Sequence, residues 1–327
     1  MIKNKKSLGA LLGEYGAFIA LILLVAVLSA VSPEFRAPSN FLNLLRQATF
    51  NGLIAVGMTC VILSDGIDLS VGSTYALSAI VCAEMIINGV PAVIAIVGAL
   101  IVGTLLGAIS GILVTKGRLQ PFIATLITMT AYRGLAMIIT DGKPISRLAA
   151  SIESESGAFL FKALGKGNLV ATFNENIRVP IPALILIAVF VLFWFILNKT
   201  TFGRRIYATG SNAKCATLVG VNTSKVKIAV YAISGFMSAL AGLIMISRLD
   251  SAQPTLASGA ELDAIAAVAL GGTSMSGGRG KIAGTVAGVL IIAVLNNGLN
   301  IMNVTSYYQD VIKAIVILVA VLSDSKR

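Results

Sequence analysis

Residues 261–300 read ELDAIAAVALGGTSMSGGRGKIAGTVAGVLIIAVLNNGLN, and they decide the fold. A short apolar helix with Glu261 and Asp263 at its start runs into a loop rich in glycine and serine. A longer helix of small residues follows, with asparagines inside it. Acids, interrupted backbone and amides are unfavourable in lipid, so they are tolerated where helices enclose a polar path. The stretch therefore predicts a membrane protein through which something polar passes.

The composition of the whole chain is that of a protein that lies in a membrane. Of the 327 residues, 57% are hydrophobic and 12% are charged, and the mean hydropathy is +0.92. A soluble domain is about half apolar and about a quarter charged. The net charge of +11 is expected from the excess of Lys and Arg in cytoplasmic loops rather than from binding of nucleic acid. We therefore expect an all-α fold, a polytopic helical membrane protein.

Apolar segments long enough to cross a bilayer recur from end to end and predict about ten transmembrane helices. Two segments, 50–64 and 260–272, are short, and each adjoins a glycine-rich break, SDGIDLSVGS (64–73) or GGTSMSGGRGK (271–281). Short, interrupted segments are the best sequence indicators of the binding path in a transporter. The ten segments are 8–31, 50–64, 70–88, 91–115, 121–140, 180–197, 226–247, 260–272, 282–302 and 306–323.

The basic residues favour one orientation of these helices. With the N-terminus in the cytoplasm, the inner segments carry 15 Lys and Arg residues and the outer segments carry 8. Because cytoplasmic loops are enriched in Lys and Arg, both termini are expected inside. The same pattern makes 141–179 an external loop and 198–225 a cytoplasmic loop. The first segment lacks an AxA-like cleavage site, so we expect it to be retained as a span.

Polar residues within or between the spans are candidates for the path. Asn296 and Asn300 lie four residues apart on one helix face, and a carboxamide both donates and accepts hydrogen bonds, which suits a neutral hydroxylated substrate. Alternatively, these amides hold helices together. The acids in the breaks border the path, or they belong to a capped turn and stabilise a helix start. The path candidates are Asp65, Asp68, Ser70, Glu261, Asp263, Asn296, Asn297 and Asn300.

Two sets of glycines recur at intervals of four and leave helix faces flat. Such faces let helices approach closely, either within one chain or between two copies in a dimer. The sets are Gly103, Gly107 and Gly111, and Gly280, Gly284 and Gly288.

The inner loop contains SNAKCATLVG (211–220), in which Ser211 or Asn212 caps a short helix that Gly220 ends. A capped helix in the most basic inner loop is a candidate docking element for a cytoplasmic partner. The alternative is a solvated loop that carries charge only for orientation. The residues assigned to docking are Arg204, Arg205, Gly210, Asn212, Lys214, Ala216, Leu218 and Gly220.

No enzyme active site is expected in the chain. The phosphate-loop pattern GxxxxGK[ST] fails at 275–282, because Met275 replaces the first glycine and Ile282 follows the lysine. There is no histidine, and the three cysteines are scattered, which argues against a disulfide framework, a metal site or a nucleophile. We therefore expect no cofactor in this chain. If transport is driven by ATP, a partner chain binds the ATP and its Mg²⁺.

At these motifs the chain closely resembles the membrane permease subunit of bacterial ribose-type ATP-binding-cassette importers. The resemblance covers nearly the whole length, and loop 141–179 matches least. The matching stretches are AVGMTCVILSDGIDLSVGS, KGRLQPFIATLITMTAYRG, RLDSAQPT, ELDAIAAVALGGTSMSGGRGKIAGT and LNNGLNIMNVTSYYQDVIKAIVILVAVL.

The resemblance implies a single transmembrane permease domain over residues 1–327 in the bacterial cytoplasmic (inner) membrane. It implies a second copy of the chain, a cytoplasmic ATPase subunit with two nucleotide-binding halves, and an extracytoplasmic sugar-binding protein. The helix at 212–220 is then the coupling helix seated on the ATPase. Membrane lipid surrounds the assembly, and no nucleic acid is expected.

The leading hypothesis is therefore a permease that imports ribose or a related monosaccharide. Similar permeases carry xylose, galactose, a furanosyl signalling molecule or a nucleoside, and these substrates stay open. An alternative of a different class is a secondary transporter in which Asp65 or Asp68 carries coupling protons. A membrane subunit that transports nothing fits the intramembrane polar groups poorly.

Overall fold

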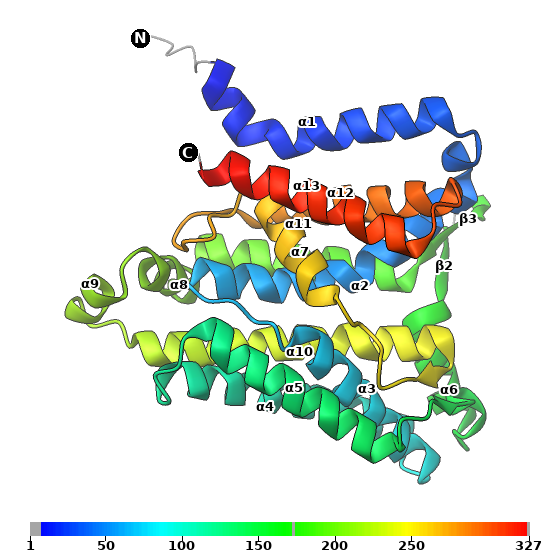
Figure 1. The fold of residues 1–327 in the computed structure, drawn as a ribbon. Coiled ribbons are helices and arrows are strands. Elements are labelled where there is room, and N and C mark those ends of the chain that lie inside the picture. Colours follow the sequence, from blue (N-terminus) through cyan, green and yellow to red (C-terminus); the bar gives the residue numbers. More distant parts are fainter. Residues whose placement is uncertain (1–7, 172–173, 326–327) are drawn as a thin grey trace.

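The computed structural model describes residues 8–171 and 174–325, and their helices run mostly along one direction (Figure 1). Four helices are short: α6 (Glu155–Lys166), α8 (Thr201–Ser211), α9 (Ala213–Leu218) and α11 (Ala260–Leu270). The long helices are α1 (Leu8–Val31), α2 (Pro38–Leu63), α3 (Val71–Ile87), α4 (Ala92–Thr115), α5 (Pro121–Thr140), α7 (Ile181–Lys199), α10 (Thr223–Leu249), α12 (Ile282–Ile301) and α13 (Ser306–Ser325).

Strands and 3₁₀ turns are minor parts of the described chain. Strand β1 (Ile145–Ser146) pairs antiparallel with β4 (Ser251–Ala252), and β2 (Asn168–Ala171) pairs antiparallel with β3 (Asn174–Pro180). The 3₁₀ turns are η1 (Glu34–Arg36) and η2 (Leu148–Ala150). Loop 141–179 is therefore largely ordered by β1, η2, α6, β2 and β3.

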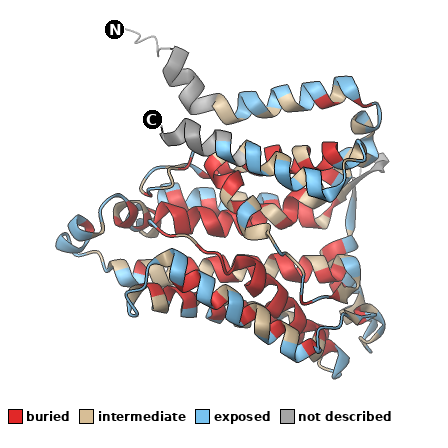
Figure 2. Cartoon of the chain, viewed as in Figure 1, coloured by how far each residue is buried: buried red, intermediate tan, exposed pale blue. Residues whose placement is uncertain are grey.

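By length and apolar composition, 6 helices in the described part of the chain are able to cross a membrane: α2, α4, α5, α7, α10 and α12. The segment Gly16–Val31 and helix α3 are shorter apolar helices. The outward faces of α4, α5 and α7 carry exposed isoleucines, leucines and valines, as expected for contact with lipid (Figure 2). The prediction of a polytopic helical membrane protein is confirmed.

The expectation that 50–64 is a short span is wrong, because α2 has 26 residues and begins at Pro38. Proline suits the first helical position, where its missing N–H is not needed. The polar N-terminal half of α2, which precedes the expected segment 50–64, is helical, and its side chains find partners within the protein. Arg46 Nη2 donates to Asn168 Oδ1 at 2.7 Å, and Asn40 pairs with α12. The other expected short segment is α11, with 11 residues.

The two breaks at 64–70 and 271–281 meet each other. The N–H of Gly278 donates to the carbonyl of Leu63, the last residue of α2, at 3.0 Å. Gly278 has a φ of +70°, a conformation that favours glycine. Gly210 of α8 packs so closely on the same carbonyl that a Cβ there would overlap it. Close backbone contacts therefore join α8, the end of α2 and the loop before α12.

Neighbouring helices of the same chain pack directly against glycines of both sets. A Cβ at Gly107 or Gly103 of α4 would overlap the backbone or side chains of α10, and one at Gly284 or Gly288 of α12 would overlap α11. This supports intramolecular helix packing, the first of the two alternatives, for both sets.

Figure 1 shows α8 and α9 at one end of the bundle, together with the start of α1 and the end of α13. Helix α6 and the β2–β3 pair lie at the opposite end. The two loops that the basic residues assigned to opposite sides of the membrane are thus at opposite ends of the molecule.

Candidate functional site

A cavity of about 590 Å³, here called the polar cleft, opens between α2, α11 and α13. Its wall combines amide, carboxylate and ammonium groups with backbone from the turn before α11. The lining residues are Asn51, Ala257, Ser258, Gly259, Ala260, Leu262, Asp263, Asp310, Lys313 and Ala314.

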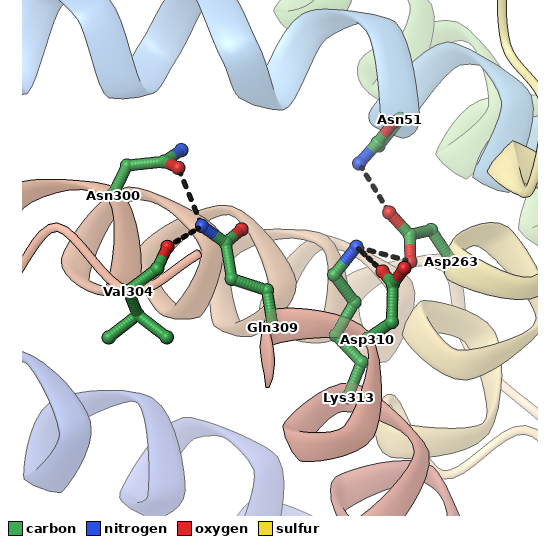
Figure 3. Close-up of polar contacts among 7 residues, drawn as sticks. All are labelled: Asn51, Asp263, Asn300, Val304, Gln309, Asp310 and Lys313. Atoms are coloured by element: carbon green, nitrogen blue, oxygen red, sulfur yellow. Dashed lines mark hydrogen bonds and ion pairs between the residues drawn. The ribbon is translucent and has the colours of Figure 1, made fainter. Parts of the chain in front are cut away.

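Lys313 lies between two carboxylates in the cleft (Figure 3). Its Nζ is 3.7 Å from Asp263 Oδ1 and 3.5 Å from Asp310 Oδ1, and Asn51 Nδ2 donates to Asp263 Oδ2 at 3.5 Å. Charge-assisted hydrogen bonds are usually about 2.7–2.9 Å long. These contacts are longer, so the donors and acceptors in the cleft are only partly paired with one another.

A second group of polar side chains lies at the start of α13, beside the turn that connects it to α12. Gln309 Nε2 donates to Asn300 Oδ1 and to the Val304 carbonyl, both at 2.8 Å (Figure 3). Gln309 and Lys313 are four residues apart and share one face of α13. Asn300 and Asp263 are therefore brought to the same side of α13.

Asn297 and Asn296 are both buried on α12 but differ in their partners. Asn297 exchanges two hydrogen bonds with Asn40 of α2, at 2.8 and 3.0 Å. Asn297 therefore holds α12 against α2, which is the second of the two alternatives given for the asparagines of this helix. Asn296 Oδ1 has no hydrogen-bond partner among the described residues. Its place in a path stays a prediction.

Asp68 and Ser70 lie elsewhere, in a buried group here called the hydroxyl seam. Asp68 is 1% exposed and accepts from Ser70 N–H at 3.0 Å, Ser70 Oγ at 2.6 Å and Ser234 Oγ at 2.8 Å. Ser70 Oγ is 3.4 Å from Ser110 Oγ of α4. The carboxylate therefore ties the α2–α3 connection to α4 and α10, and it is not a solvated acid in a turn.

Asp65 points away from this seam. Its side chain is 61% exposed and lies 3.9 Å from Lys227 Nζ, which donates to the Asp65 carbonyl at 3.0 Å. Glu261 and Asp263 are in the first turn of α11, as expected for acids that stabilise a helix start. Glu261 lies against Gly72 of α3, where a Cβ would come within 2.7 Å of its Oε2. The structure thus places Asp263 in the cleft, Asp68 and Ser70 in the seam, and Asp65 at the exposed end of α2.

The predicted capped helix is α9. Asn212 is its N-cap, and its Oδ1 accepts from Cys215 N–H at 2.9 Å. Gly220 follows with a φ of +85°, as predicted for a residue that ends a helix. Leu218 is 86% exposed and the neighbouring Val219 is 79% exposed. The end of the capped helix α9 therefore exposes two apolar side chains, Leu218 and Val219, to the surroundings of the protein.

The other residues assigned to docking fall into two groups. Arg204, Arg205 and Lys214 are exposed. Gly210 and Ala216 are buried against the chain, so their side-chain positions are not available to a partner in this structure. These two residues pack α8 and α9 against the rest of the protein.

The polar side chains of the site that were not among the predicted path residues are those of Asn51, Ser258, Gln309, Asp310 and Lys313. Asn51 lies within the expected segment 50–64, but its partner Asp263 belongs to another helix, so no local spacing indicates its role. The spacing of Gln309 and Lys313 on one helix face was a usable signal.

Comparison with known proteins identifies the family. A family model described as "Branched-chain amino acid transport system / permease component" matches residues 40–321. The chain belongs to this permease family. It is 49% identical to the ribose import permease protein RbsC of Haemophilus influenzae, covering 99% of this chain and 98% of that relative. It is 51% identical to RbsC of Bacillus subtilis, covering 96% and 93%.

A further relative is the xylose transport system permease protein XylH of Escherichia coli, 37% identical over 88% of this chain and 84% of the relative. No solved structure matches the chain. The resemblance to ribose-type permease subunits is confirmed, and the chain is a multi-pass membrane permease.

The Asn40–Asn297 pair generates a stability prediction. Asn297→Leu leaves the Asn40 amide largely unpaired in the bundle, so we expect the free energy of unfolding to fall by about 1–3 kcal/mol. The thermal unfolding midpoint of the purified protein in detergent measures this loss.

The matched control is the double variant Asn40→Leu with Asn297→Leu. Replacing both partners by apolar groups removes the unpaired amide. The double variant should therefore lose less free energy of unfolding than the two single variants lose together. Strictly additive losses would show that the pair does not join α2 to α12.

Proposed function

We propose that this chain is the translocating subunit of an ATP-driven importer for ribose or a related monosaccharide in the cytoplasmic membrane of a bacterium. Two relatives that align along nearly the whole chain are ribose import permeases, and a more distant one belongs to a xylose transport system. The observation that carries the proposal is the polar cleft. Its volume of about 590 Å³ admits a small solute, and its wall offers both donors and acceptors.

The chemistry of the cleft suits a neutral hydroxylated solute. A sugar loses hydrogen bonds to water on entering a membrane, and each unmatched group costs about 1–3 kcal/mol. Asn51, Asp263 and Lys313 offer replacements, and Asn300 with Gln309 continues the polar surface along α13. The long contacts between these groups keep the site from binding tightly, which is what a path requires.

Helix α9 couples the permease to the ATPase subunit that drives transport. The apolar tip formed by Leu218 and Val219, with the exposed cations of α8 beside it, is the surface that meets the ATPase subunit. Movement of α9 passes to Gly210, and from there through the carbonyl of Leu63 to Gly278 and α12. ATP and Mg²⁺ are bound by that partner. A second copy of this chain and an extracytoplasmic sugar-binding protein complete the importer.

The end of the bundle with α8 and α9 is the cytoplasmic end in this proposal. The starts of α1 and the end of α13 lie there, so both termini are cytoplasmic, and α6 lies outside (Figure 1). The distribution of Lys and Arg supports the same orientation.

Uptake of radiolabelled ribose into vesicles that contain the complete importer tests the function. We expect uptake to require internal ATP and to persist with a protonophore. Asn51→Leu should lower uptake about tenfold, because one donor and acceptor is lost from the cleft wall. Its hydrogen bond to Asp263 is long, so the protein should stay folded.

The control for this variant is Asn198→Leu, which removes an exposed amide that, among the described residues, bonds only to the Trp194 carbonyl of its own helix. Uptake equal in the two variants would contradict the role of the cleft. Collapse of uptake with the protonophore, without need for ATP, would favour the proton-coupled alternative.

Docking of the ATPase is tested by Leu218→Asp. Placing a charge in an apolar contact at the tip of α9 should weaken co-purification of the ATPase subunit about tenfold or more, while the permease still inserts and folds. The test uses Leu218 rather than Ala216, because a charge at the buried Ala216 would disturb α9 itself.

Leu160→Asp, at the α6 end of the bundle, is the matched control and should leave ATPase association unchanged. Full association of the Leu218→Asp variant would show that α9 is not the docking helix.

A further inference from the structure

A second polar pocket, of about 320 Å³, lies at the α9 end of the bundle, between the α4–α5 turn, α9 and the start of α10. It is separate from the polar cleft and shares no residue with it. Its polar wall carries one ammonium group and three hydroxyls, and its apolar wall belongs to α4 and the start of α5. The polar lining residues are Asp65, Thr115, Thr223, Ser224 and Lys227.

The charge around this pocket is strongly positive. Lys227 lines it, and Lys116, Arg118 and Lys225 directly adjoin lining residues in the sequence. Within the described part of the chain, Lys116, Arg118 and Lys225 make no ion pair. The single acid in the wall is Asp65, whose carboxylate is 3.9 Å from Lys227 Nζ. The wall itself holds one cation and one carboxylate, and three further exposed cations adjoin it in the sequence, so the excess charge at the pocket rim is positive and favours an anionic ligand.

An apolar surface continues from the pocket along α5. Leu119 belongs to the pocket wall and is exposed, and Phe122, Ile123, Leu126 and Ile127 are exposed on the helix that begins at Pro121. Residues 122 and 126, and 123 and 127, are four apart and form one face. A hydroxyl-lined pocket with a lysine in its wall thus adjoins an exposed apolar strip on α5.

We propose that this pocket binds the phosphate headgroup of an anionic phospholipid, with the acyl chains lying along α5. The two halves of the surface match the two halves of that ligand: a phosphate needs cations and hydroxyl donors, and acyl chains need apolar side chains. A soluble phosphate would use only the pocket, and a neutral lipid would use only the strip. Because Ala213 of α9 is part of the wall, the bound lipid supports the base of α9.

The test is lipid retention by the purified chain, which does not depend on transport. The protein is equilibrated with dioleoylphosphatidylglycerol or dioleoylphosphatidylcholine, and bound lipid is counted by native mass spectrometry. We expect preferential retention of phosphatidylglycerol. Each cation removed should weaken that binding about fivefold, since a Lys or Arg near an anionic lipid surface contributes about 1 kcal/mol.

Two variants probe the pocket: Lys227→Gln, and the exposed pair Lys116→Gln with Arg118→Gln. The pair keeps the test decisive if Lys227→Gln, which also loses the bond to the Asp65 carbonyl, fails to fold. Lys162→Gln with Lys166→Gln, on α6 at the opposite end, is the control and should retain the lipid.

Three results would overturn the proposal. The first is equal retention of phosphatidylglycerol by the wild type and the pair variant. The second is an equal loss in the α6 control. The third is full competition by millimolar inorganic phosphate, which would identify a free phosphate ion as the occupant.

Discussion

The structure depends on one constraint: a polar group that enters the membrane must find its partners inside the protein. Asp68 satisfies it with three donors from Ser70 and Ser234, and Asn297 satisfies it with the amide of Asn40. Each of these polar contacts fixes one helix against another. Between them, glycine faces bring α4 against α10 and α12 against α11, so that small residues and hydrogen bonds replace the hydrophobic contacts that hold a soluble core.

The polar cleft departs from this rule. Its groups contact one another at 3.5–3.7 Å, too long for full pairing, and they border an open volume. A site that is incompletely paired is suited to a solute that brings its own hydroxyls. The backbone contacts of Gly210, Leu63 and Gly278 join α8 to the loop before α12 and to α2, whose Asn51 lines that cleft.

Much of the fold follows from the sequence, because apolar length and glycine-rich breaks are local signals. The segments for α3, α4, α5 and α11 and the cap at Asn212 are all recognisable in this way. The site is less accessible, because it depends on partners far apart in the chain. Asp68 and Asp65 look alike in SDGIDLS, yet one is buried in the seam by Ser234 and the other is exposed beside Lys227. Likewise, no local pattern reveals that Asn297 meets Asn40 or that Asn51 meets Asp263.

Thiol accessibility tests the central claim most directly. In a Cys215→Ser background the two remaining cysteines, Cys60 and Cys82, are buried. Cysteine is then placed either at Ala314, in the wall of the cleft, or at Ser234, in the hydroxyl seam. In open membrane fragments, a membrane-impermeant maleimide should label Ala314→Cys, excess ribose should slow that labelling, and Ser234→Cys should stay unlabelled. An unreactive Ala314→Cys, or equal labelling of the two positions, would contradict the account.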